Sequence, residues 1–321
     1  MRRLITGLAA ATALVVAVAG CGSSNPSDGT AGNGGPASVT VGVIPIVDVA
    51  PIYLGKEKGF FSDRDIDLTL ETGQGGAAIV PGVLGGQLQF GFSNVTSLMV
   101  AQTENVPIKA VVNGVASTGQ AGADFGAIVV RGDSVIQSAK DLAGKKVAVN
   151  TLKNIGDTSV RESVRKDGGD PAAVQFVEIG FPQMPAALDA GQVDAAWVVE
   201  PSLSVVKAGG GRVVASNFVD VAPDLTVALY FTSDKLLQED PGLVERFVEA
   251  MRESLAYADA NPDEVRRIIG TYTQIDEATV AELTLPKWPA DYNRESLEVL
   301  ARLGQQDGLF TSAPDLDKLF S

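Results

Sequence analysis

Short apolar runs that favour β-strands alternate with helix-forming segments twice along this chain, and this alternation limits the folds open to it. The first series extends from residues 39–44 to 108–115, and the second from 126–130 to 201–210. Strands that alternate with helices form βαβ units and a mostly parallel sheet. After residue 240 the pattern becomes mostly helical. We therefore expect an α/β protein.

One short stretch occurs in both series. Residues 86–92, GQLQFGF, align with residues 191–197, GQVDAAW, and each predicts a glycine at a helix end followed by a strand. A helix start follows both stretches, at Asn94 and at Pro201. Two similar α/β units indicate two lobes. Chance similarity between two helix-to-strand turns is the alternative, because seven residues specify little.

The N-terminus has the pattern of a targeting segment. A basic pair, Arg2 and Arg3, precedes an apolar run over residues 4–19, as in secretory signals. The only cysteine, Cys21, follows in the sequence V-A-G-C, which resembles the lipobox of bacterial lipoproteins. In that pattern the cysteine thiol carries a diacylglycerol. The sequence therefore predicts a signal peptide over residues 1–20 and lipidation at Cys21. A plain cleaved signal with an incidental cysteine is the alternative.

Residues 21–38 contain the lipidation site and a stretch of Gly, Ser, Asn and Pro, so we expect a flexible tether there. Two acyl chains anchor a protein stably to a membrane, whereas one binds only marginally. We therefore expect an extracytoplasmic protein held on the cell membrane by its lipid. The formal net charge of −14 argues against nucleic acid as a partner and against electrostatic binding to anionic lipid.

The composition also excludes several kinds of chemistry. The chain has no histidine, and its one cysteine is assigned to the lipid. Metal sites built from His or Cys are thereby excluded, as are Ser-His-Asp and Cys-His catalysis. No glycine-rich phosphate loop is present. We expect no cofactor, no metal and no enzymatic activity, although carboxylate catalysis stays open on composition alone.

Several stretches, taken in order, resemble the solute-binding proteins of the nitrate, sulfonate, taurine and thiamine-pyrimidine-precursor family. They are VGVIPIVDVAPIYLGKEKGFFSDRDIDLTLE, GQLQFGFSNVTSLM, IVVRGDSVIQSAKDLAGKKVAVNTLKNIGDTSV and GQVDAAWVVEPSL. The resemblance implies a two-lobed periplasmic-binding-protein fold of type II, with a ligand cleft between the lobes. It also implies that the chain delivers a small molecule to the permease of an ABC importer.

The resemblance further implies a discontinuous first lobe, residues 39–126 plus 227–321, and a second lobe over residues 127–226. Crossings near 126–130 and 225–231 would form the hinge, and we expect a monomer. The family includes a pyrimidine synthase that is said to consume its own histidine and to carry a cysteine-rich motif. The lack of histidine and of a spare cysteine argues against that activity. A lipoprotein that presents a surface to a protein partner is a third possibility.

Ligands of open α/β sheets bind beyond the carboxyl ends of the strands, and four loops qualify here. The candidate ligand-binding residues in these loops are Asp48, Tyr53, Ser93, Asn94, Thr96, Asn154, Gly156, Asp157, Thr158 and Glu200. Asn94 and Asp157 are equally suited to cap helices. Asp48 and Glu200 are the stronger candidates, because carboxylates at the ends of buried strands need a partner. Trp197 is expected in the core.

The charge balance of these loops indicates the ligand class. They hold one base, Lys153, against the acids Asp48, Asp157 and Glu200. This balance favours a ligand with N–H donors, such as an amino-pyrimidine or a related nitrogen heterocycle. Helix N-termini bind anions without any arginine, so sulfonate, taurine, nitrate and aromatic carboxylates stay open. We predict that Asp48 and Glu200 face the cleft from opposite lobes and accept hydrogen bonds from the ligand.

Overall fold

The computed structural model of this chain describes residues 35–320. The predicted signal peptide, Cys21 and most of the predicted tether lie outside the described residues. Within the described part, no helix is both long enough and apolar enough to cross a bilayer.

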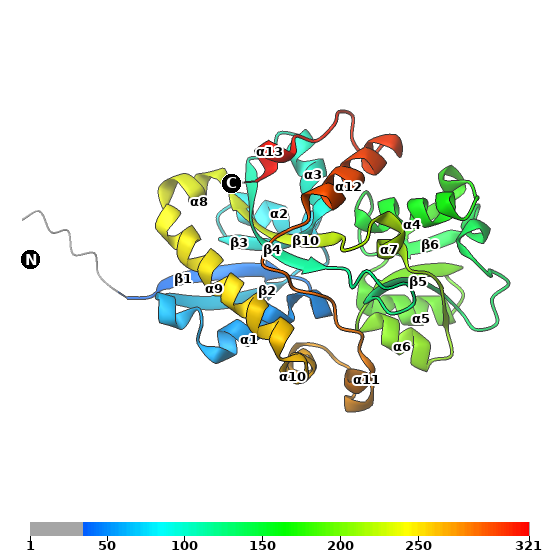
Figure 1. The fold of residues 1–321 in the computed structure, drawn as a ribbon, viewed down its shortest axis with the longest axis horizontal. Coiled ribbons are helices and arrows are strands. Elements are labelled where there is room, and N and C mark those ends of the chain that lie inside the picture. The colour runs from blue at the N-terminus through cyan, green and yellow to red at the C-terminus, as the bar shows by residue number, and fades with distance from the viewer. Residues whose placement is uncertain (1–34, 321) are drawn as a thin grey trace, which may run out of the picture. The chain divides into compact units, whose positions relative to one another are not determined.

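The first of two five-stranded sheets combines N-terminal strands with one strand from far along the chain. In spatial order it contains β2 (Ile66–Thr72), β1 (Ala37–Val43), β3 (Phe90–Asn94), β10 (Thr226–Ser233) and β4 (Ile108–Ala116). β1 runs parallel to β2 and β3, whereas β10 is antiparallel to β3 and β4. We call this sheet and the helices packed on it the first lobe (Figure 1).

The second sheet repeats this arrangement. In spatial order it contains β7 (Gln175–Glu178), β6 (Lys146–Val149), β8 (Ala195–Val199), β5 (Gly126–Val130) and β9 (Arg212–Ala215). β6 is parallel to β7 and β8, and β5 is antiparallel to β8 and β9. This sheet and its helices form the second lobe, drawn mostly in green in Figure 1. The two-lobed α/β fold that the sequence predicts is confirmed.

The repeated stretches at 86–92 and 191–197 lead into β3 and β8. Both strands hold the third place in their sheets, and every residue in each strand is buried. A strand covered on both faces favours apolar residues, which explains the apolar character of residues 90–92 in β3 and of all of β8. The equivalent positions of β3 and β8 support the interpretation that the chain contains two similar α/β units.

The positions predicted for the crossings need correction. Residues 126–130 and most of 225–231 lie inside the sheets, as β5 and β10. The chain instead passes between the sheets through residues 117–125 and 216–225, outside the β-strands. β5 and β10 are fully buried and antiparallel to their neighbours, so their apolar runs reflect burial within a sheet.

Helices cover the faces of both sheets. The helices are α1 (Ala50–Lys58), α2 (Gly76–Leu84), α3 (Val95–Thr103), α4 (Ile155–Lys166), α5 (Met184–Asp189), α6 (Ser202–Ala208), α7 (Asn217–Val221), α8 (Asp234–Glu239), α9 (Pro241–Ala260), α10 (Pro262–Tyr272), α11 (Glu277–Glu282), α12 (Arg294–Gln306) and α13 (Leu316–Leu319). In the first lobe, α9 buries an apolar stripe at helical spacing. Its Phe247 ring stacks on Phe90 with 3.7 Å between ring centroids.

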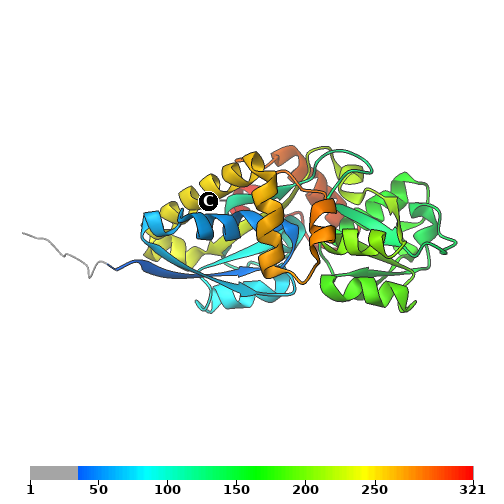
Figure 2. The same cartoon turned by 90° about the horizontal axis from the view of Figure 1, so that it is seen from below.

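The C-terminal part of the chain contacts both lobes. Helix α11 packs against α6 of the second lobe, and Figure 2 shows α11 in orange beside α10. Helix α12 contacts α3 of the first lobe and both α4 and α7 of the second. These contacts join the lobes in addition to the two chain crossings. Thr284, in the segment after α11, donates a hydrogen bond to Glu200 of the predicted site.

Candidate functional site

A small cavity lies between the two lobes. From the first lobe it is lined by Ile44, Ile46, Asp48, Phe92, Asn94, Val227 and Ala228, and from the second by Asn150, Ile155, Phe181, Trp197, Val199 and Phe218. Its free space holds only about one water molecule. A ligand of several heavy atoms therefore enters only when the lobes separate.

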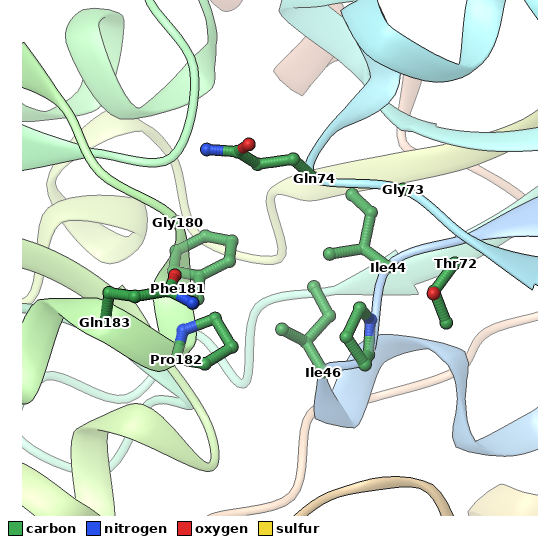
Figure 3. A pocket seen from close by; sticks show the side chains of 10 residues that line it. Ile44, Ile46, Thr72, Gly73, Gln74, Gly180, Phe181, Pro182 and Gln183 are labelled. Carbon is green, nitrogen blue, oxygen red and sulfur yellow. The ribbon is translucent and has the colours of Figure 1, made fainter.

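A groove forms the mouth of this cavity. It measures about 560 Å³, including the solvent at its opening, and lies between Ile44 and Ile46 on one side and Phe181 on the other. Figure 3 shows these side chains facing one another, with Gln74 above them. The same three residues line the inner cavity. Phe181 is buried and lines both the groove and the cavity, so it lies where the two meet.

Asp48 places a carboxyl group in the cavity. It lies in a short 3-10 turn, Val47–Val49, at the start of α1, and 3% of its surface is exposed. Its carbonyl oxygen accepts a hydrogen bond from Trp288 Nε1 at 3.0 Å, whereas its Oδ1 has no partner among the described residues. Burial raises the pKa of this carboxyl to about 8.

Tyr53 supports the Asp48 loop from outside the cavity. Its ring stacks on Tyr272, with centroids 4.0 Å apart and an angle of 13° between the rings. The Tyr272 hydroxyl in turn donates to the carbonyl of Ile46 at 3.0 Å. Tyr53 is absent from the described residues that line the cavity.

The helix N-termini predicted to bind polar oxygens are already occupied by caps. Asn94 Oδ1 accepts hydrogen bonds from Ser97 N at 2.9 Å and, across the lobes, from Ile155 N at 3.3 Å. Asn154 Oδ1 accepts from Gly156 N at 2.8 Å and from Asp157 N at 3.4 Å. The Ser97 amide of α3 and the first three amides of α4 are therefore bonded within the protein.

The remaining candidates in these two loops lie within the protein interior. Ser93 Oγ donates to the carbonyl of Asn94 at 3.1 Å, and Thr158 Oγ1 to that of Asn154 at 3.3 Å. Thr96 is fully buried. Asp157 Oδ2 accepts from Lys153 N at 2.9 Å, and burial raises the pKa of Asp157 to about 6. Of the residues in these two loops that were predicted, only Asn94 lines the cavity.

Gly156 allows close packing of α4 against Trp197. A Cβ at this position would lie 2.4 Å from Cε3 of the Trp197 ring, closer than any real contact. The absence of a side chain at residue 156 therefore lets the indole lie flush against the first turn of α4. Gly156 shapes the cavity through Trp197.

Glu200 lies outside the cavity, and both of its carboxylate oxygens are bonded within the protein. Oε2 accepts from Ser204 N at 2.9 Å, and Oε1 accepts from Ser204 Oγ at 2.9 Å and from Thr284 N at 3.1 Å. Its carbonyl oxygen accepts from Val47 N at 3.0 Å. Glu200 thus joins α6 to the segment after α11 and to the Asp48 loop.

Sequence reasoning missed much of the cavity lining. Phe181 and Phe218 come from segments with no clear strand or helix pattern, and Asn150 follows β6 directly. Asn150 Nδ2 donates to the carbonyl of Gln74 at 3.1 Å, which is a second contact across the lobes. The position of Asn150 at the end of a strand is the sequence feature that could have identified it as a cavity residue. Trp197, expected in the core, is buried and also lines the cavity.

Known proteins of related sequence include binding proteins and a synthase. A candidate binding protein of Brucella abortus (strain 2308) is 24% identical over 82% of this chain and 79% of its own length. The taurine-binding periplasmic protein of Escherichia coli (strain K12) is 26% identical over 59% of this chain and 56% of that protein. The 4-amino-5-hydroxymethyl-2-methylpyrimidine phosphate synthase THI5 of Saccharomyces cerevisiae is 20% identical over 66% of this chain and 64% of the enzyme.

A solved structure has the same fold. The alkanesulfonate-binding protein of Xanthomonas axonopodis pv. citri, bound to MOPS, superposes with a TM-score of 0.76 at 16% identity. The match covers 90% of this chain and 99% of that protein. The family described as NMT1/THI5 like matches residues 46–265, which include β2 to β10 and every cavity-lining residue except Ile44. The chain belongs to the NMT1/THI5-like family.

Proposed function

We propose that this chain is the solute-binding component of an ABC importer and that it captures a nitrogen heterocycle with N–H donors, such as an amino-pyrimidine. The observation that carries the proposal is a buried carboxyl with an unpartnered oxygen, Asp48 Oδ1, in an aromatic cavity between two lobes. Phe92, Phe181 and Phe218 offer apolar surfaces to a flat ring. The carboxyl accepts the hydrogen bond of an amino group on that ring.

The lack of a basic side chain among the described lining residues favours this ligand class over a sulfonate. None of the described lining residues is basic, and Asp48 is acidic. Of the helix-start amides that could hold an anion, Ser97 N of α3 is bonded to Asn94, and Gly156 N and Asp157 N of α4 are bonded to Asn154. A sulfonate such as taurine is the second candidate, because a taurine-binding protein and an alkanesulfonate-binding protein are among the similar proteins.

Capture occurs by closure of the lobes. We assign residues 39–126 and 227–321 to the first lobe and 127–226 to the second, with the links 117–125 and 216–225 as the hinge. The tight cavity and the contacts from Ile155 to Asn94 and from Asn150 to Gln74 are features of a closed state. The chain acts as a monomer that passes its ligand to a permease. It has no catalytic role, in keeping with a sequence that lacks histidine.

A thermal-shift screen tests the ligand class. The panel consists of 4-amino-5-hydroxymethyl-2-methylpyrimidine, taurine, an aliphatic sulfonate and nitrate. We expect the pyrimidine to stabilise the protein by about 2.7 kcal/mol when present at a hundred times its dissociation constant. Scattering should show a smaller radius of gyration with that ligand. Stabilisation by taurine alone would transfer the assignment to sulfonates, and an unchanged radius would contradict lobe closure.

Membrane attachment through Cys21 is part of the same proposal. Cys21→Ala is expected to move nearly all of the protein from the membrane fraction to the soluble fraction, because the diacylglycerol supplies both acyl chains. Fractionation of the expressing cells, with Ser23→Ala as the matched control, measures this. If Cys21→Ala stays with the membrane, the apolar run at residues 4–19 is itself the anchor.

A further inference from the structure

We infer that the indole N–H of Trp197 is a second ligand contact. It donates a hydrogen bond to an acceptor on the side of the ligand opposite to Asp48. This inference rests on the proposed function. It narrows the ligand class to rings that carry both a hydrogen-bond donor and a hydrogen-bond acceptor. The position of the Trp197 ring, its unpartnered N–H group and its close packing support it.

Trp197 has a buried N–H group without a partner. The residue lies on β8, lines the cavity and is 3% exposed. Its Nε1 has no hydrogen-bond acceptor among residues 35–320. By contrast, Nε1 of Trp288, also 3% exposed, donates to the carbonyl of Asp48. Because the indole N–H can only donate and buried donors are nearly always paired, Trp197 is suited to an acceptor that arrives from outside.

The packing around Trp197 fixes the direction of this donor. The ring contacts Phe181 at a centroid distance of 5.3 Å and Phe218 at 5.9 Å, both edge to face. On another side it lies against Gly156, where a Cβ would come within 2.4 Å. A ring held by these neighbours cannot turn to find another acceptor. Preorganised donors of this kind favour ligands that match their geometry.

Two unpartnered polar atoms of the cavity therefore come from opposite lobes. Asp48 Oδ1 belongs to the first lobe and Trp197 Nε1 to the second, and the remaining lining is apolar except for Asn94 and Asn150. Both of those carboxamides are bonded within the protein. A ligand that satisfies both atoms carries an N–H donor toward the first lobe and an acceptor toward the second. An amino-substituted ring with a ring nitrogen has both.

The test compares two flat amines that differ in the acceptor. Both 4-aminopyrimidine and aniline carry an amino group, but only the pyrimidine has ring nitrogens. Calorimetric titration of the wild type and of Trp197→Phe should show about a tenfold loss of affinity for 4-aminopyrimidine and a change below about twofold for aniline. The matched control is Phe218→Leu, which alters the packing of the same cavity without removing a donor and should weaken both ligands alike.

Equal losses for both amines in Trp197→Phe, or no loss for either, would overturn the inference. The titration includes taurine so that a failure of the proposed ligand class is distinguished from a failure of the Trp197 contact. If the wild type binds taurine and neither amine, the heterocycle class is wrong. A loss of taurine affinity in Trp197→Phe would then show that the indole N–H still donates a hydrogen bond to the ligand. An unchanged taurine affinity would overturn that role. Absence of binding by all three probes would overturn both proposals.

A second measurement uses the wild type and therefore tests the Trp197 contact even if Trp197→Phe fails to fold. The chain has two tryptophans, so the nitrogen-15 spectrum of the intact protein contains two indole signals, assigned with Trp288→Phe. Addition of 4-aminopyrimidine should move the Trp197 N–H proton signal downfield and slow its exchange with solvent, whereas aniline should do neither. Identical responses to the two amines would contradict an acceptor contact.

Discussion

Asp48→Asn is expected to raise the free energy of unfolding of the ligand-free protein, with a gain that grows from about zero near pH 4 to as much as about 5 kcal/mol above pH 8. The carboxyl has a pKa of about 8 in the folded protein, raised by burial from 3.8. Below pH 4 it is protonated in both states. Between pH 4 and 8 unfolding releases its proton, so the stability of the wild type falls as pH rises. Asparagine has no such proton.

Urea denaturation at pH 4, 6 and 8 measures this difference. Burial also raises the pKa values of Asp124, Asp157 and Glu200, so the wild type loses stability with pH for several reasons. The difference between wild type and Asp48→Asn isolates one carboxyl. Asp63→Asn, at an exposed position, is the matched control. A difference that stays constant with pH would show that Asp48 is ionised and paired in the folded protein.

The groups that face Asp48 set the limits of this expectation. Asp124 adds a like charge that raises the pKa of Asp48 further. Tyr230 is buried and Tyr272 is half-buried near it, and desolvation holds the pKa values of both well above the ordinary range, so they stay neutral across this pH interval. No basic side chain lines the described cavity. The carboxyl therefore lacks a cation to stabilise its charged form until a ligand supplies one or a strong donor.

The sequence predicted the fold well because local patterns determine it. Burial on both faces gives β3 and β8 their apolar character, and the glycines before them end helices in both lobes. The crossings were misplaced, since an apolar run does not distinguish a hinge from a central antiparallel strand. Short helices such as α7 and α8 were missed for a similar reason, because five or six residues carry too little periodicity.

The site was harder to predict, because its partners are distant in sequence. The position after a strand identified Asp48, and that residue does line the cavity. The same rule selected Glu200, yet Thr284, 84 residues further on, donates to its carboxylate. Asn94 and Asp157 were open to interpretation as helix caps. The structure has Asn94 capping α3, whereas α4 is capped by Asn154 and not by Asp157. Their predicted contacts with a ligand stay untested, as does that of Glu200.

Glu200→Gln is expected to lower the free energy of unfolding by about 2–3 kcal/mol, as for the loss of a buried hydrogen bond to a charged group. In the wild type both carboxylate oxygens accept, one from Ser204 N and the other from Ser204 Oγ and Thr284 N. Glutamine offers one oxygen and one NH₂ group. Whichever way the amide turns, its NH₂ faces an N–H donor, and one backbone amide loses its acceptor.

Two further variants separate the contributions. Ser204→Ala removes only the hydroxyl contact and should cost about 1 kcal/mol. Glu282→Gln changes a neighbouring exposed carboxylate on α11 and should leave stability unchanged. Glu200→Gln should also weaken binding of 4-aminopyrimidine and aniline by the same factor, because Glu200 lies outside the cavity and its side chain affects the ligand only through the position of the Asp48 loop, which is bonded to the Glu200 backbone. Unchanged stability with a ten- to hundredfold loss of affinity would instead make Glu200 a ligand contact, as its place after β8 first indicated.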